Sequence, residues 1–200
     1  LDLLRSLNAF CIAGNHERAL LNNSGELWAN EWAREALIWQ SERITEENLT
    51  FIFEQETCRE HAIGLLTHGT PQSPYEYVDK QSAVQVFTQH DFALGFFGHT
   101  HEPTVFTAPR EMETSGVIKP RARTERYPVR LEELETACLC NPGSVGQPRD
   151  LDPRASYAIF DDEKGYISLN RVEYDIELVQ KEMRSHNFPS FAIRRLAVGM

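Results

Sequence analysis

Long apolar runs are missing from this chain of 200 residues. No stretch approaches the roughly 18–20 continuous apolar residues that a helix needs to cross a bilayer, so we expect no membrane partner. The first residues also lack a basic region followed by an apolar core, which is the pattern of a secretory signal peptide. These absences predict a protein of the cytoplasm.

Positive charge is in short supply. The chain has 20 Lys and Arg residues against 30 Asp and Glu residues, which gives a formal net charge of −10. A protein that binds long nucleic acid neutralises phosphates with clustered Lys and Arg side chains. The charge balance therefore argues against a long nucleic-acid partner and favours a small phosphorylated substrate or a phosphoprotein.

Cysteine is scarce as well. The chain has 4 cysteines and no C-x-x-C pair, so neither a disulfide framework nor a zinc knuckle is expected. Cys11, Cys138 and Cys140 lie within or beside apolar segments of strand length, where a free cysteine acts as a small hydrophobic residue. We expect reduced, structural thiols.

Two catalytic motifs are absent. The chain contains no G-x-x-x-x-G-K-[ST] sequence, which excludes P-loop chemistry. Ser144 lies in a G-S-V-G sequence whose spacing differs from the G-x-S-x-G nucleophile elbow, so a tight turn is the better interpretation there.

The chain does contain alternating strand-like and helical segments. Apolar runs of strand length cover residues 9–13, 51–53, 62–67, 93–97 and 137–140. Helical spacing covers residues 24–40, 78–89 and 175–184, residues 107–136 favour peripheral strands, and residues 157–160 and 166–174 favour a hairpin. Strands that alternate with helices early and follow one another late predict a layered α/β domain.

Histidines follow three of these apolar runs. Asn15 and His16 lie in the sequence GNHE, His68 lies in THG, and His99 and His101 lie in GHTH. Ligand sites in α/β sheets lie beyond the carboxyl ends of the strands, and neutral imidazole is the commonest metal ligand. A single such histidine would more often bond to the backbone at a strand end. Four of them at three strand ends favour a metal site.

The motifs resemble those of a known family. GNHE at 14–17, THG at 67–69 and GHTH at 98–101 look like the third, fourth and fifth blocks of the calcineurin-like metallophosphoesterases. NPGSVGQPR at 141–149, followed by RASY, resembles the small bacterial branch of that superfamily. The resemblance implies a four-layer α/β/β/α sandwich with two sheets face to face, helices outside and metals at the strand ends.

The resemblance also implies a set of roles. Two divalent transition metal ions, from Mn, Fe, Zn or Ni, would share a bridging hydroxide that attacks phosphorus. Asn15, His68 and His99 would bind one metal, and His101 would bind the other. His16 would contact the phosphate and protonate the leaving oxygen as general acid.

Two further residues have open roles. Glu17 stands where many relatives have Asp, and it is either a solvated acid or a partner that orients His16. Arg149 follows the NPGS turn, and it is either a substrate-binding residue or a residue that faces away from the site.

Two blocks of the family pattern are absent before Gly14. Relatives open with an Asp-x-His and a Gly-Asp, each at a strand end, and these supply the remaining ligands. A β-α-β opening needs about 30 residues, and only 13 precede Gly14. We therefore expect an N-terminally incomplete domain that lacks its opening β-α-β segment and assembles at most a weak half-site. The domain would span residues 1–200, with 175–200 as a C-terminal helical extension that packs externally or mediates a homodimer.

The resemblance predicts a dinuclear metal-dependent phosphoesterase. Its substrates would be phosphomonoesters or phosphodiesters, as in small nucleotides, dinucleoside polyphosphates or phosphoproteins. The absent carboxylates motivate an alternative, which is a catalytically inactive scaffold for protein interaction, like the retromer subunit that has this fold.

Overall fold

The computed structural model describes residues 1–22, 31–109, 116–118, 129–130 and 136–200. The helices are α1 (Asp2–Ser6), α2 (Asn15–Leu21), α3 (Glu31–Ser41), α4 (Glu46–Phe53), α5 (Lys80–Gln89), α6 (Ile176–Ser185) and α7 (Ser190–Arg195). The strands are β1 (Cys58–His61), β2 (Gly64–Thr67), β3 (Leu94–Phe96), β4 (Thr104–Pro109), β5 (Gly116–Ile118), β6 (Val129–Arg130), β7 (Thr136–Asn141), β8 (Ala155–Asp161) and β9 (Tyr166–Val172).

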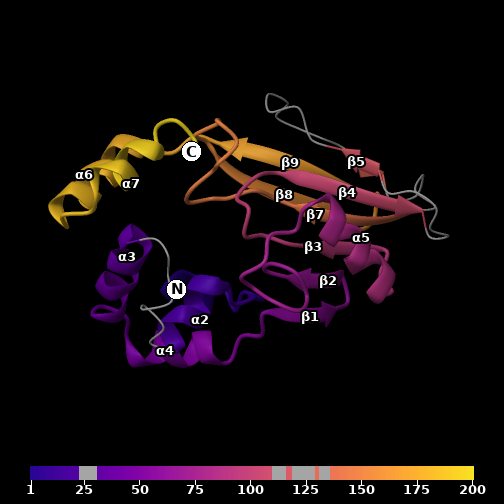
Figure 1. Cartoon of the computed structure of the whole chain (residues 1–200), viewed down its shortest axis with the longest axis horizontal. Coiled ribbons are helices and arrows are strands. Elements are labelled where there is room, and N and C mark those ends of the chain that lie inside the picture. The colour runs from indigo at the N-terminus through magenta and orange to yellow at the C-terminus, as the bar shows by residue number, and fades with distance from the viewer. Residues whose placement is uncertain (23–30, 110–115, 119–128, 131–135) are drawn as a thin grey trace.

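The larger sheet positions the site. Its strand order is β1-β2-β3-β7-β4-β5, and its inner strands β2, β3 and β7 run parallel (Figure 1). Leu65 pairs with Gly95, and Gly95 pairs with Leu139, so the three apolar runs expected as strands form the centre of this sheet. Their carboxyl ends meet at one edge of the sheet, which faces the helical end of the molecule.

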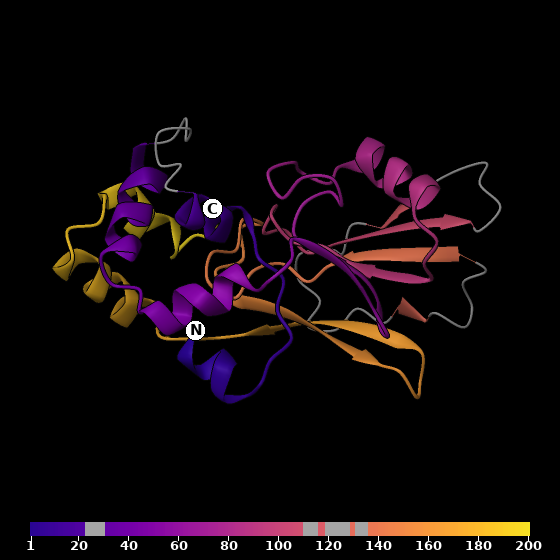
Figure 2. The same ribbon diagram turned by 90° about the horizontal axis from the view of Figure 1, so that it is seen from below.

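Two apolar layers lie on opposite faces of β7. Leu139 faces α5, where it joins a cluster with Leu65 and Val86. Cys138 and Cys140 face the smaller sheet, of order β6-β9-β8, and pack with Ile167 of β9. Figure 2 shows α5 on one side of the larger sheet and the β8–β9 hairpin on the other. This alternation follows from the two-residue period of a strand and makes two sheets and α5 successive layers.

The cysteines are free thiols, as expected. Cys138 and Cys140 are fully buried in the core between the sheets. Burial raises the pKa of Cys138 to about 12, so this thiol stays protonated and unreactive at neutral pH.

Helices gather at the end of the molecule that the site edge faces. Figures 1 and 2 place α2, α3 and α4 there, together with α6 and α7. Helix α6 matches the helix predicted over 175–184. It is capped by Asp175, whose carboxylate accepts a hydrogen bond from the Leu178 N–H at 2.9 Å. The Trp39 ring of α3 contacts the Phe188 ring beyond α6, with centroids 5.5 Å apart. In the part of the chain that the structure describes, no helix is long and apolar enough to cross a membrane.

Some predicted elements were wrong. Residues 51–53 belong to helix α4, because the Thr45 side chain caps its first turn by accepting the Asn48 N–H. Residues 9–13 form no strand, and Phe10 is 45% exposed. Strand β1 was missed because its sequence CREH is polar, as suits an exposed edge strand.

Other predictions fall partly outside the described residues. The helix expected over 24–40 is described only from residue 31, as α3. The peripheral strands expected over 107–136 are represented by β4, β5 and β6, and residues 110–115, 119–128 and 131–135 lie outside the described part.

Candidate metal centre and active site

The parallel strands bring the predicted histidines to one edge. His68 follows the last residue of β2, and His99 lies three residues beyond β3. The two segments are joined by a hydrogen bond of 2.8 Å from the Gly98 N–H to the His68 carbonyl. The imidazole rings of His68 and His99 lie with centroids 5.1 Å apart. The sheet therefore places two of the predicted ligands side by side.

Asn15 reaches the same edge from the first residue of α2. Its Oδ1 atom lies 2.9 Å from Nε2 of His68, and the residue is 8% exposed. The preceding Gly14 makes this approach possible, because a Cβ atom there would lie 2.7 Å from Cε1 of His68. Asn15 thus joins the histidine pair only because residue 14 has no side chain.

His99 and His101 share a left-handed loop, with φ of 63° and 62°. The Nε2 atom of His99 lies 3.2 Å from the Tyr75 carbonyl, and its ring stacks on Tyr77 with centroids 4.4 Å apart. The Nδ1 atom of His101 lies 2.7 Å from the Gln147 carbonyl. A carbonyl only accepts, so these bonds assign the proton to Nε2 of His99 and to Nδ1 of His101. The other nitrogen of each ring is left with a lone pair suited to a metal.

Burial keeps these imidazoles neutral. It lowers the pKa of His68 to about 4, with a smaller contribution from the charge of His99. It lowers the pKa of His101 to about 4 as well, and the positive charge of Arg149 adds to this. The pKa of His99 is also lowered, first by burial. At neutral pH the rings are therefore in the unprotonated form that binds metals.

His16 follows Asn15 on α2 and lines a cavity of about 330 Å³ together with Leu20 and Trp39. Burial lowers the pKa of His16, the negative charge of Glu17 raises it, and the positive charge of Arg149 lowers it. The charges of Glu17 and Arg149, both candidate site residues in the sequence, therefore act on His16.

Glu17 also caps the start of α2. Its Oε2 atom accepts the Gly14 N–H at 2.8 Å, which forms one arm of a capping box. The same carboxylate that influences His16 therefore also fixes where the helix begins. The proposal that Glu17 orients His16 stays a prediction, since the hydrogen bond runs to the backbone of Gly14.

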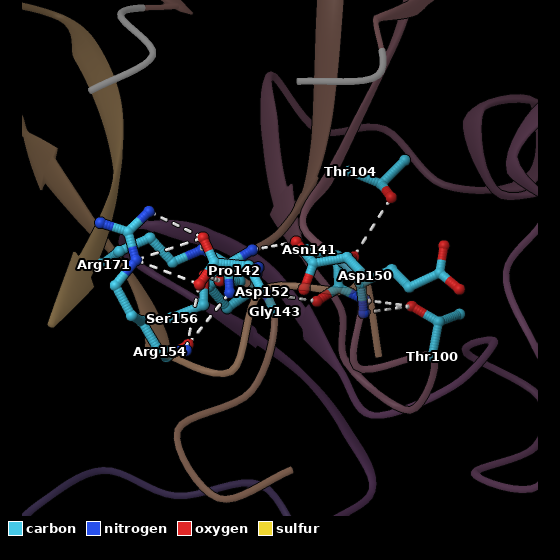
Figure 3. A network of polar contacts seen from close by, with 11 residues as sticks. Thr100, Thr104, Asn141, Pro142, Gly143, Asp150, Asp152, Arg154, Ser156 and Arg171 are labelled. Atoms are coloured by element: carbon cyan, nitrogen blue, oxygen red, sulfur yellow. Dashed lines mark hydrogen bonds and ion pairs between the residues drawn. The ribbon is translucent and has the colours of Figure 1, made fainter. Parts of the chain in front are cut away.

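A buried asparagine holds the histidine loop in place. Asn141, the last residue of β7, is 0% exposed. Its Nδ2 atom donates to the Gly98 carbonyl at 2.8 Å and to Oγ1 of Thr100 at 2.9 Å, and its Oδ1 atom accepts the Gly143 N–H at 2.8 Å. Figure 3 shows Asn141 between Thr100 and Gly143. One side chain therefore ties the GHTH loop to the NPGS loop.

The loop that carries Arg149 follows directly. The Arg149 N–H donates to the His101 carbonyl at 3.2 Å, and its Nη2 atom donates to Gln147 at 3.0 Å. Its Nε atom is buried and has no hydrogen-bond partner among the described residues. A backbone hydrogen bond therefore holds Arg149 beside His101, and the Nε–H of Arg149 is left without an acceptor in the described part of the chain.

Ion pairs support that loop from the smaller sheet. Arg171 of β9 donates to the Asp150 carboxylate, and Arg154 binds Asp152 at 2.7 Å (Figure 3). The side chains of Arg171 and Asp150 are 8% and 14% exposed. Sequence reasoning missed these pairs and the role of Asn141. Asn141 had a signal in the NPGS block, whereas Arg171 and Asp150 lie 21 residues apart and belong to none of the recognised motifs.

The donor set fits part of a dinuclear centre. Imidazole nitrogens together with the Asn15 carboxamide oxygen suit Mn, Fe, Zn or Ni. Among the described residues, no group of three or more His, Cys, Asp or Glu side chains lies close enough together to hold a metal ion. Before Gly14 the sequence also has no Asp-x-His or Gly-Asp to add carboxylates. The residues present therefore fit the imidazole and carboxamide side of such a centre.

Comparisons with known proteins identify the family of this chain. The family model of the calcineurin-like phosphoesterase superfamily domain matches residues 3–165. The crystal structure of a metallophosphoesterase from Sphaerobacter thermophilus is 31% identical, with a TM-score of 0.81 over 100% of this chain and 80% of that one.

Two further proteins are similar. An uncharacterized protein from Methanocaldococcus jannaschii is 31% identical over 204 residues, which is 99% of this chain and 79% of that protein. A hypothetical protein from Pyrococcus horikoshii, 14% identical, has a TM-score of 0.73 over 100% of this chain and 77% of its own, and shows the fold alone. The predicted α/β fold is confirmed, and the chain belongs to the calcineurin-like phosphoesterase superfamily, as a hydrolase of the metallophosphoesterase type.

Proposed function

We propose that this protein hydrolyses phosphomonoesters or phosphodiesters at the edge formed by β2, β3 and β7. The observation that carries the proposal is the meeting of His68, Asn15 and His99, with Nε2 of His68 2.9 Å from Asn15 and the two imidazole rings 5.1 Å apart. These side chains come from separate parts of the chain and converge where an α/β sheet binds its ligands.

Metal binding is the first part of the proposal. Asn15, His68 and His99 would hold one divalent transition metal ion, and His101 would contribute to the site of a second. Such a pair of ions supplies Lewis acidity and an activated water for in-line displacement. Because the imidazoles and the carboxamide carry no negative charge, this side of the site repels a phosphate anion less than carboxylates would.

His16 and Arg149 act on the substrate in this proposal. The positive charge of Arg149 would attract the phosphate. The hydrogen bond from the Arg149 N–H to the His101 carbonyl keeps Arg149 at the site. A bound phosphate raises the pKa of His16, as an opposite charge does for any imidazole. His16 would then carry the proton that the leaving oxygen needs. The negative charge of Glu17 acts in the same direction on His16.

The proposed substrates are small nucleotides, dinucleoside polyphosphates or phosphoproteins. A net charge of −10 disfavours long nucleic acid. A homodimer through residues 175–200 is a further proposal, to be measured by light scattering.

The test is turnover of p-nitrophenyl phosphate and of bis(p-nitrophenyl) phosphate with added Mn²⁺. His16→Ala should lower kcat/KM at least about 100-fold, as expected for lost general-acid catalysis. His99→Ala removes a proposed metal ligand and should lower kcat/KM by at least about 100-fold as well. The matched control is His61→Ala, since His61 is exposed at the end of β1 where it pairs with the start of β2.

Each outcome has a meaning. Undiminished turnover in both site variants would refute these roles. Absent turnover together with absent metal in elemental analysis of the purified protein would favour the scaffold alternative.

A further inference from the structure

The cavity beside His16 lies among the helices next to the candidate site. It has a volume of about 330 Å³, and its lining residues include His16 and Leu20 of α2, Trp39 of α3 and Ile52 of α4. Helices α3 and α4 both contact α2 (Figure 1). His16 directly follows Asn15, whose side chain contacts the histidine that ends β2. The cavity therefore begins at the candidate site and extends among these helices.

Polar side chains at this cavity are engaged within the protein. Arg43 donates to the Trp39 carbonyl and to the Glu42 carboxylate, both at 3.0 Å. The Arg43 guanidinium also lies over the Trp39 ring, 4.5 Å from its centroid. The Asn48 amide donates to the Asp2 carboxylate at 2.8 Å. With these groups engaged, the cavity offers a ligand mainly its apolar surface.

The apolar surface suits a small aromatic group. It comes from Leu20, Trp39, Ile44 and Ile52. Small-molecule sites are cavities of roughly 300–1,000 Å³ with mostly apolar walls, so a volume near the lower limit suits a single aromatic ring system. An aromatic ring gains free energy from burial and also from stacked or edge contacts with an indole ring.

The proposed reaction determines which part of a substrate meets this cavity. Water attacks phosphorus, the bond from phosphorus to the leaving oxygen breaks, and that oxygen takes a proton from His16. Such a transfer requires the leaving oxygen to lie within hydrogen-bond distance of His16. Because His16 lines the cavity, the alcohol attached to that oxygen would enter it.

We propose that this cavity binds the leaving alcohol of the substrate and selects alcohols that carry an aromatic ring. This inference rests on the proposed function and narrows its substrates. It favours phosphoesters whose leaving group carries a nucleoside base or a tyrosine ring over esters of serine or threonine side chains.

The test compares phenethyl phosphate with ethyl phosphate in the presence of Mn²⁺. Their leaving alcohols are both primary and of similar acidity, so the ratio of the two kcat/KM values measures the contacts of the phenyl ring. The unaltered protein should prefer the phenethyl ester at least about tenfold, as expected for burial of a phenyl group. Equal kcat/KM for the two esters would overturn the inference and leave the proposed function intact.

Gln40→Trp tests where the phenyl ring binds. Gln40 is an exposed residue of α3 that lines the cavity, so an indole ring at this position should fill the space and abolish the preference. Ser41→Trp is the matched control and should keep the preference, because Ser41 is the next exposed residue of α3 and does not line the cavity.

Leu20→Ala decides the matter if Gln40→Trp fails to fold. The loss of apolar wall should lower the preference about fourfold, the equivalent of one buried methylene group. A preference that is unchanged in the variant that folds would overturn the inference.

A binding experiment separates this inference from the proposed function. If neither ester is turned over, the proposed hydrolysis fails, and calorimetric binding of phenylpropylphosphonate and propylphosphonate decides about the cavity. In these probes a methylene group replaces the leaving oxygen. Binding of the phenyl probe at least about tenfold more tightly, with the difference lost in Gln40→Trp, would support the cavity as the aromatic site. Equal affinity for the two probes, or binding of neither, would overturn it.

Discussion

The two sides of the candidate site are held in different ways. On the strand side, His68, His99 and His101 follow paired, parallel strands. Asn141 ties the loop of His99 and His101 to the loop after β7, and the Gly98 N–H bonds to the His68 carbonyl. On the helix side, residues 9–14 belong to no strand or helix, and the contacts that hold them include the hydrogen bond from the Ala13 N–H to the Glu56 carbonyl and the capping bond from Gly14.

Because of this difference, we expect substitutions on the two sides to affect different properties, stability on the strand side and activity on the helix side. The groups that hold the strand side together, Asn141 and the Arg171–Asp150 pair, lie in a largely buried polar network, so altering them should destabilise the protein. Groups on the helix side touch the site through a few short contacts, so altering them should displace Asn15 and His16 with little effect on the core. The following predictions test that division, from the largest expected change in free energy to the smallest.

Arg171→Met should have the largest effect on stability. The substitution leaves the Asp150 carboxylate buried without its partner, and breaking such a buried pair costs about 3–5 kcal/mol. For a chain of this size the Tm should fall by roughly 6–20 °C in a thermal unfolding experiment. Asp150→Asn in the same chain should restore part of the loss. A change in Tm of less than about 2 °C would contradict a role for this pair in holding the loop.

Asn141→Ala should lower the free energy of unfolding by about 2–4 kcal/mol. The side chain makes hydrogen bonds to Gly98, Thr100 and Gly143 within a buried setting, and the groups left behind lose their partners. Urea unfolding measures this directly. The control is Asn170→Ala. Among the described residues the Asn170 amide bonds only to Ser168, two residues away, so its loss should cost less than about 1 kcal/mol.

Gly14→Ala lies on the helix side and should lower activity while it changes stability little, which is the opposite of the two preceding variants. The new methyl group would meet His68 at 2.7 Å and push the two sides apart. A misplacement of about 1 Å costs roughly 100-fold in rate, so kcat/KM should fall by that factor while the Tm changes little. Gly146→Ala is the matched control, since nothing lies within 4 Å of the added Cβ atom. Equal activity of the two variants would remove the argument that residue 14 must be glycine.

Glu17→Ala should have the smallest effect. It removes the acceptor for the Gly14 N–H, and loss of a helix cap costs about 1 kcal/mol. It also removes the negative charge that raises the pKa of His16. Glu17→Gln keeps an acceptor without the charge, so recovery of Tm but not of kcat/KM would show that Glu17 acts on His16. Recovery of both would limit Glu17 to the cap.

The sequence predicted what depends on local pattern. The apolar runs around Leu65, Gly95 and Leu139 predicted the central strands, and the histidines that follow two of them met as expected. The β8–β9 hairpin and α6 were also predicted, because the two-residue period and a capping aspartate are visible in a short window.

The errors have physical causes as well. The run at 51–53 is too short to distinguish a strand from the last turn of a helix, and the cap at Thr45 decides it. The contacts of Arg171 with Asp150, and of Gly199 in the C-terminal tail with Leu151, depend on tertiary packing between distant segments and leave no periodic signal. Asn141 was visible in its motif, but its bonds to Gly98 and Thr100 required the strand ends to be placed.

The central claim is that Asn15, His68, His99 and His101 form a metal-binding edge. Calorimetric titration of the purified protein with Mn²⁺ tests it most directly, with His68→Ala and the exposed control His61→Ala measured alongside. The account predicts saturable Mn²⁺ binding that His68→Ala weakens at least about tenfold, the lower end for loss of an interaction at a metal site, and that His61→Ala leaves unchanged. Equal affinity in all three proteins, or no binding in any, would contradict it.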